Sequence, residues 1–234
     1  MMLEKLINCL DKIYHHKRIT KFLNKYQISL LIDIGAHKGE FIKNFLKGKN
    51  KLKKIYAFEP QENIFQILEN RFKNDKKIKK FQNALDWKIG KKTLFINKLS
   101  STSTLSKTNE NSYFLKLKNI LTNSKDFYVN KYKVKTITLD YFLKNKNLKN
   151  TLLKIDVEGN EYNVLKGAKK VIKEIDFILI ERHFFSIHKN YNYSLSHNLL
   201  LKNKFELVKN FKFPLLNFED KLYINTSIYK KRMI

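Results

Sequence analysis

The chain has 234 residues, and its 48 lysines and arginines against 21 aspartates and glutamates give a formal net charge of +27. This length fits one domain with a substantial core of its own, so neither disulfides nor structural zinc are needed to hold the fold together. The only cysteine, Cys9, excludes an intramolecular disulfide, and we therefore expect a reducing, cytoplasmic setting.

The first predicted element is an amphipathic helix at the N-terminus, where apolar residues recur at helical intervals among charged ones. This segment lacks both the apolar core of a signal peptide and the ~20 apolar residues of a membrane span. We expect residues 1–29 to form a helical cap and residues 30–234 to form the main domain. The next predicted elements are a strand at Leu30–Ile34, a helix at 40–47, a strand at Lys54–Phe58, a helix at 61–72 and a strand near 80–85.

A polar, lysine-rich region at 91–133, with a serine and threonine cluster at 100–106, then interrupts the alternation. We expect it to be an insertion that binds the substrate. The pattern resumes with a strand at 151–157, a helix at 160–172, a strand at 177–180, a helix at 194–202 and an antiparallel pair at 205–208 and 222–228. Alternating strands and helices predict an α/β fold with about seven strands, mainly parallel, and helices on both faces.

The segment LLIDIGAHKGEF changes from a buried strand to a turn with the spacing D-x-G-x-x-x-G, formed by Asp33, Gly35 and Gly39. Glu59 ends the next strand, 26 positions after Asp33. An acidic residue at this position can accept hydrogen bonds from both hydroxyls of a cofactor ribose. The dinucleotide and triphosphate glycine motifs are missing from the sequence. These features favour S-adenosylmethionine as the cofactor. The alternative is an ordinary tight turn followed by a solvated glutamate.

A third motif, LLKIDVEGNEYNVLKGA, places Asp156 and Glu158 at the end of a central strand. Because the two residues are two apart, their side chains point to the same side. They could hold a substrate hydroxyl, orient the ammonium group of the cofactor or bind a divalent cation. Alternatively, only Asp156 is functional while Glu158 and Glu161 cap the following helix. A magnesium site formed by Asp156, Glu158 and Glu181 is a further alternative.

These motifs, together with NALDWKIGKKTL and TITLD, resemble the FkbM-type family of S-adenosylmethionine-dependent methyltransferases. The resemblance implies a class I methyltransferase (Rossmann-like) fold and O-methylation of a sugar, a glycan unit or a secondary metabolite. It assigns cofactor binding to the motif positions Asp33, Gly35, Gly39 and Glu59, and matches Asp156 and Glu158 to the family's carboxylates. One departure is His37, where the family commonly has asparagine.

Three further residues are candidates by their position after strands. Ala84 and Asp86 lie where this fold encloses the adenine, although Asp86 could equally be a surface turn residue. His183 could accept the proton of an acceptor hydroxyl, because histidine titrates near neutrality. The alternative is a surface or merely hydrogen-bonded histidine. Four other histidines show no partner spacing and are set aside, namely His15, His16, His188 and His197.

The predicted reaction is a direct displacement, in which an acceptor oxygen attacks the sulfonium methyl group while Asp156 or His183 orients or deprotonates the acceptor. We expect a small-molecule or glycan acceptor. The charge would favour nucleic acid, but only four cations are arginine, the lysines are dispersed and no base-methylation motif is present. Two rivals remain: a nucleic-acid methyltransferase, and a non-catalytic binder of anionic glycans or of an anionic membrane surface.

Overall fold

The fold was analysed in a computed structural model that describes residues 14–97, 103–107, 128–184, 188–189, 191–213 and 218–232. Residues 1–13, which include Cys9 and the first half of the predicted cap, lie outside these ranges. So do residues 98–102 and 108–127 of the predicted insertion. No helix in the described ranges is both long and apolar enough to cross a bilayer.

The main sheet has seven strands in the order β3-β2-β1-β7-β8-β10-β9. Its strands are β1 (Leu30–Ile34), β2 (Lys54–Phe58), β3 (Ile78–Phe81), β7 (Thr151–Ile155), β8 (Phe177–His183), β9 (Phe205–Lys212) and β10 (Phe218–Asn225). The first five strands of this order pair in parallel, and β10 pairs antiparallel with both β8 and β9. The predicted seven-stranded, mainly parallel sheet is thus confirmed.

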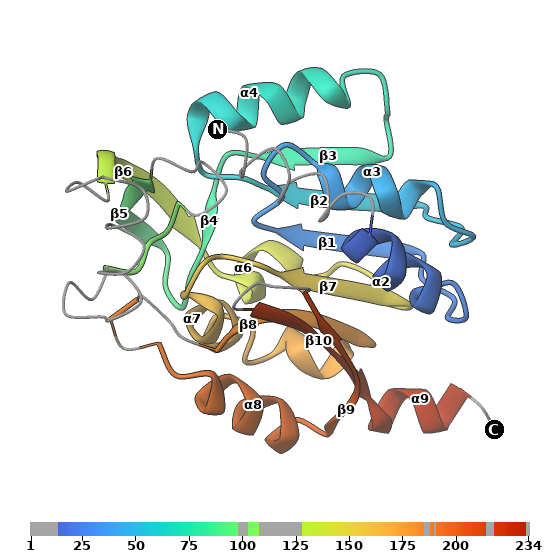
Figure 1. The fold of residues 1–234 in the computed structure, drawn as a ribbon. Helices are drawn as coiled ribbons and strands as arrows, with labels where there is room; N and C mark the ends of the chain where they lie inside the picture. Colours follow the sequence, from blue (N-terminus) through green and yellow to red (C-terminus); the bar gives the residue numbers. More distant parts are fainter. Residues whose placement is uncertain are drawn as a thin grey trace.

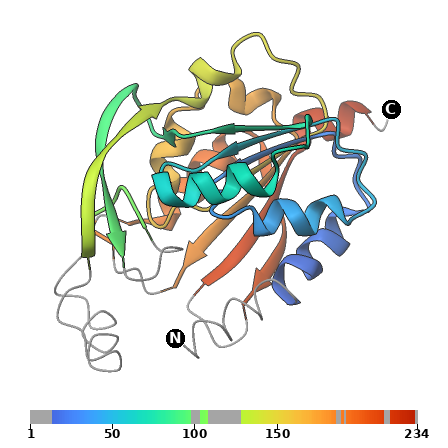
Figure 2. The same cartoon turned by 90° about the horizontal axis from the view of Figure 1, so that it is seen from above.

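Helices cover both faces of this sheet (Figures 1 and 2). On one face lie α2 (His16–Leu23), α3 (Glu40–Leu46), α4 (Glu62–Arg71) and α9 (Thr226–Arg232). On the other face lie α6 (Leu139–Leu143), α7 (Glu161–Lys166) and α8 (Tyr193–Lys202). Each set buries its apolar side against one face of the sheet, which explains why every residue of β1 and β7 is buried.

Several predicted elements differ in extent from those observed. The expected strand at 80–85 divides into β3 and β4 (Ala84–Leu85), which belong to different sheets. The helix expected at 160–172 ends at Lys166, because the Asp140 carboxylate caps a separate 3₁₀ helix, η3 (Val171–Glu174), by accepting the N–H groups of Lys170 and Val171. Strand β8 runs on to His183, which pairs with the start of β10, and β10 ends at Asn225, where α9 begins.

A second sheet of order β4-β6-β5 is formed by β4, β5 (Gly90–Asn97) and β6 (Tyr128–Ile137). The long arms β5 and β6 pair antiparallel and flank the central part of the predicted insertion. Residues 103–107 return to this sheet through a bridge between Phe95 and Thr104. The small sheet therefore presents one described piece of the insertion beside the carboxyl ends of β1, β2 and β7, with which it lines a common cavity.

Candidate active site

The carboxyl ends of β1 and β7 carry the two buried charges nearest the sheet centre. Asp33 and Lys154 are register partners on these neighbouring strands, and Lys154 Nζ lies 3.4 Å from an Asp33 oxygen. The same Nζ lies 3.0 Å from Asp156, the first residue after β7. Burial alone would lower the pKa of Lys154, but these carboxylates, Asp156 first, outweigh it and raise that pKa. Lys154 is therefore a cation between two carboxylates.

A cavity opens at this edge of the sheet. Its floor is formed by the ends of β1, β2 and β7, and its walls by the turn 35–38, by α2 and α3, by β4 and by the 103–105 piece of the insertion. Apolar side chains of Phe41, Phe58, Leu94 and Val157 share this lining with charged groups of Glu59, Lys154, Asp156 and Glu158. A cavity with apolar walls and a few convergent polar groups is the usual form of a small-molecule site.

The two motif glycines are needed by the packing of the protein itself. Gly35 has φ +79°, and a Cβ there would lie 1.7 Å from the carbonyl oxygen of Asp156. Gly39 has φ +78°, and its Cβ would lie 2.3 Å from the ring of Phe72. Gly35 lines the cavity through its backbone. Gly39 is absent from the lining and contributes to the conformation of the turn. The observed reason for both glycines is thus internal close approach, in addition to any ligand contact.

His37 occupies the tip of the same turn with φ +48°. Its backbone N–H donates to Glu59 Oε2 at 3.0 Å, and its ring Nδ1 lies 3.5 Å from Glu40. Histidine and asparagine are both among the residues that tolerate positive φ, so the departure from asparagine leaves the turn intact.

Glu59 lies in the cavity wall at the end of β2 and is buried. One carboxylate oxygen accepts the N–H of His37 and the other accepts the N–H of Gln61 at 2.8 Å. Burial nevertheless raises the pKa of Glu59 to about 7, against the opposing effect of these N–H groups. A carboxylate has about four acceptor positions, so about two remain for further donors.

The two predicted adenine contacts occupy different environments. Ala84 lines the cavity together with Asn83 and Leu85. The side chain of Asp86 is fully buried, is absent from the cavity lining, and pairs with Lys92 Nζ of β5 at 2.6 Å. Asp86 is therefore neither an exposed turn residue nor part of the cavity wall; it anchors β5 to β4.

Asp156 is the most accessible of the predicted catalytic carboxylates, with a third of its side chain exposed toward the cavity that it lines. Burial of the group opposes its ionisation, but Lys154 Nζ outweighs this effect and lowers the pKa of Asp156. The neighbouring side chains of Glu181 and His183 lower this pKa further. An ionised carboxylate held in this way can accept a hydrogen bond from a hydroxyl at the cavity.

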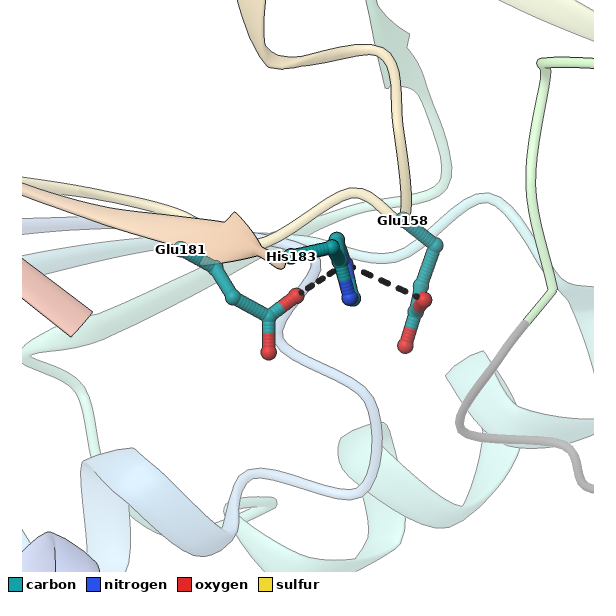
Figure 3. A group of neighbouring side chains, drawn as sticks. All are labelled: Glu158, Glu181 and His183. Atoms are coloured by element: carbon teal, nitrogen blue, oxygen red, sulfur yellow. Dashed lines mark ion pairs between the residues drawn. The ribbon is translucent and has the colours of Figure 1, made fainter. Parts of the chain in front are cut away.

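Glu158, Glu181 and His183 form a compact cluster beside Asp156, in which the His183 ring lies between the two carboxylates (Figure 3). His183 Nε2 is 2.9 Å from Glu181 and 3.5 Å from Glu158. Burial would lower the pKa of His183, but Glu181 and then Glu158 raise it well above its ordinary value. The two carboxylates thus favour the protonated ring, and a protonated ring only donates hydrogen bonds, which favours Asp156 over His183 as the group that accepts a hydrogen bond from an acceptor hydroxyl.

The insertion contacts this acidic turn directly. Thr104 Oγ1 donates to the carbonyl oxygen of Glu158 at 2.5 Å, and Ser106 Oγ donates to that of Gly159 at 3.0 Å. Glu158 itself has φ +53°, an unusual conformation for glutamate. A second hollow beside the cavity, sharing Leu105 and Asn160 with it, is lined by three lysines and by several tyrosine and asparagine side chains. Those lysines are Lys92, Lys107 and Lys189.

Comparisons with known proteins identify the family and the fold. Residues 33–207 match the Methyltransferase FkbM domain. The chain belongs to the FkbM methyltransferase family. The match spans all the candidate residues named from the sequence, from Asp33 to His183. A comparison with curated proteins gave no match.

The FkbM-family chain is similar to a crystal structure of methyltransferase FkbM from Methylobacillus flagellatus KT, with a TM-score of 0.55 and 15% identity over 84% of this chain and 43% of that one. It thus spans less than half of that protein. A SAM dependent methyltransferase from Aquifex aeolicus matches with a TM-score of 0.50 and 9% identity, over 95% of this chain and 98% of that one. These likenesses confirm the class I, Rossmann-like fold.

Two residues of this FkbM-family cavity were missed in the sequence. Lys154 lies within the apolar run LLKI. A lysine inside a buried strand could have indicated a buried, paired charge. His16 lines the cavity from α2, where burial and then Lys154 lower its pKa to about 4. The dismissed histidines do have partners: His15 pairs with Asp220, and His197 with Tyr223. These partners lie far along the chain, so spacing could not show them.

Proposed function

We propose that this protein is an S-adenosylmethionine-dependent O-methyltransferase that acts on a hydroxyl of a sugar, a glycan unit or another small metabolite. The observation that carries the proposal is Glu59, a buried carboxylate in the cavity wall, 26 positions after Asp33, that keeps acceptor positions for the two hydroxyls of a ribose. Family membership supports the methyl-transfer chemistry.

The described residues fit this cofactor. Glu59 would hold the ribose, Ala84 and the apolar side chains around it would enclose the adenine, and the backbone of the turn at Gly35 would face the amino acid part. Asp33 lies outside the cavity lining and would act on the cofactor through Lys154, which lines the cavity and also pairs with Asp156. When bound, S-adenosylmethionine supplies an electrophilic methyl group on sulfur.

The acceptor side is supported by Asp156 and by the second hollow. Asp156 would accept a hydrogen bond from the acceptor hydroxyl and orient its oxygen, and alignment of this kind would supply much of the rate gain. Proton acceptance would contribute on the order of 10²–10⁴-fold where the acceptor needs it. Lys107 and Lys189, with the tyrosine and asparagine lining of the second hollow, suit a polar acceptor that carries hydroxyl groups and negative charge. Lys92, by contrast, is already paired with Asp86.

Calorimetric titration with S-adenosylhomocysteine tests the cofactor part. We expect Glu59→Ala and Asp33→Ala to lose most of the affinity, and Glu69→Ala, which removes an exposed carboxylate of α4, to retain it. Thermal unfolding of each variant separates loss of the site from loss of the fold. Unchanged affinity in both site variants would contradict the proposal.

A methyl-transfer screen with labelled cofactor tests the acceptor part. We expect label in glycans or nucleotide-linked sugars. Labelling of RNA with strongly salt-dependent affinity would instead favour the nucleic-acid rival, for which the charge of +27 is the supporting observation. Tight binding to anionic vesicles without any cofactor binding would favour the non-catalytic rival.

A further inference from the structure

Glu158, Glu181 and His183 come from two neighbouring strand ends. Glu158 follows β7, and Glu181 and His183 are two apart on β8, which pairs in parallel with β7. Residues two apart on a strand point to the same side, so both β8 side chains reach the turn that carries Glu158. One carboxylate oxygen of each glutamate and one ring nitrogen of His183 all lie within 4.8 Å of one another.

The distances from His183 to the two carboxylates match those between ligands of one ion. His183 Nε2 lies 2.9 Å from Glu181 Oε2 and 3.5 Å from Glu158 Oε2. Transition-metal ions bind nitrogen and oxygen ligands at about 2.0–2.2 Å, which separates neighbouring ligand atoms by about 3.0 Å in octahedral and about 3.4 Å in tetrahedral sites. Both distances from His183 fit two ligands of one ion, and the remaining pair, Glu158 and Glu181, has oxygens within 4.8 Å of each other.

The contact between Glu181 and His183 is an ion pair without hydrogen-bond alignment. The Glu181 side chain is only 8% exposed, and its Oε2 and the Nε2 of His183 are both buried atoms with no hydrogen-bond partner among the described residues. A ring N–H aimed at the carboxylate at this distance would satisfy both atoms. In Figure 3 the His183 ring stands between the two carboxylates, an arrangement that could serve a shared ligand.

We propose that Glu158, Glu181 and His183 form a binding site for one divalent transition-metal cation. An imidazole with two carboxylates favours Mn²⁺ or Zn²⁺ over Mg²⁺, which prefers oxygen ligands. Asp156, whose charge is influenced by Glu181 and His183, would act on these ligands from outside the site instead of binding the cation as considered from the sequence.

Three protein ligands leave coordination positions open for another oxygen. Because the Glu158 side chain also lines the main cavity, the open positions would be available to the acceptor. Cation binding by the three residues is independent of the reaction. Only the role of the cation in holding the acceptor hydroxyl rests on the proposed function.

The test is a titration of the chelator-treated full chain with Mn²⁺, in which the electron paramagnetic resonance signal reports the concentration of free Mn²⁺. We expect one Mn²⁺ per chain, displaced by equimolar Zn²⁺ but not by equimolar Mg²⁺. Loss of a residue that only hydrogen-bonds to a metal ligand already weakens metal sites by about 10–100-fold, so His183→Gln and Glu158→Gln should each weaken Mn²⁺ binding at least about tenfold. His197→Gln, a histidine bonded to Tyr223 outside the cluster, should leave the affinity unchanged.

Pulsed resonance identifies the ligand independently of affinity. The bound Mn²⁺ should couple to a ¹⁴N nucleus that changes on labelling with ¹⁵N-histidine in the wild-type chain, and this coupling should vanish in His183→Gln. Absence of stoichiometric binding, or nitrogen coupling that persists in His183→Gln, would overturn the assignment. Parallel titration with S-adenosylhomocysteine separates the two proposals: cofactor binding without Mn²⁺ binding refutes only the metal site, and Mn²⁺ binding without cofactor binding refutes only the proposed function.

Discussion

The pKa of Glu59 predicts that cofactor affinity depends on pH. Burial raises this pKa to about 7, and two backbone N–H groups already bind its oxygens. Ribose hydroxyls would donate to the ionised carboxylate, so S-adenosylhomocysteine should bind the ionised form and displace the proton. Affinity should therefore rise with pH through about 7 and level off above it.

The magnitude follows from the fraction of Glu59 that is ionised. With a pKa of about 7, roughly one carboxyl in eleven is ionised at pH 6 and roughly ten in eleven at pH 8, so the affinity should differ by about tenfold. Near pH 7, binding should release about half a proton per chain. The titratable groups that act on Glu59 are His37, Asp33 and Tyr132.

Isothermal titration at pH 6, 7 and 8 in two buffers of different ionisation enthalpy measures both quantities. Glu59→Gln should bind more weakly, with an affinity that no longer varies with pH. His37→Asn keeps the backbone donor of the turn and should retain the pH dependence, which separates Glu59 from the neighbouring imidazole. An equal affinity at pH 6 and pH 8 in the wild-type chain, or an unchanged slope in Glu59→Gln, would refute the reasoning.

The remaining predictions concern the turn and the charged residues. Gly39→Ala adds a Cβ at φ +78° and 2.3 Å from an aromatic ring carbon, and should lower the free energy of unfolding in urea by about 2 kcal/mol or more. Its control is Gly90→Ala, where the nearest atom is 3.9 Å away and the effect should stay within about 0.5 kcal/mol. Asp33→Ala removes one of two carboxylates from buried Lys154 and should cost about 3 kcal/mol in the same assay, with recovery in the Asp33→Leu, Lys154→Met double variant; no recovery would exclude the charge pairing as the cause. Asp156→Asn should lower kcat by about 10²-fold or more and leave the S-adenosylhomocysteine affinity nearly unchanged, and an unaltered kcat would remove Asp156 from the reaction.

The order of strands and helices could be predicted because it depends on local patterns. Each buried strand is a short apolar run, each helix repeats its apolar residues at helical intervals, and glycines mark the turn after β1. Boundaries failed where a distant group intervened. The Asp140 carboxylate separates η3 from α7, and pairing with β10 lengthens β8.

The roles of individual side chains were harder to predict from the sequence, because they too depend on groups that are distant in the chain. Asp33 and Asp86 have the expected positions in the chain, yet each faces a lysine from another strand instead of the cavity. The lysine partner of Asp33, Lys154, is 121 positions away in the sequence, and spacing carries no signal over that distance.

The sequence by itself determined the α/β sheet, the glycine turn and the acidic strand ends, because strand periodicity and turn chemistry act between near neighbours. Only the tertiary structure decided which carboxylates share Lys154, which one remains at the cavity, and that His183 meets Glu158 and Glu181. Those encounters depend on the order β1-β7-β8 in the sheet, which brings together strand ends that are far apart in the chain. Charge pairing acts across space, and burial strengthens it.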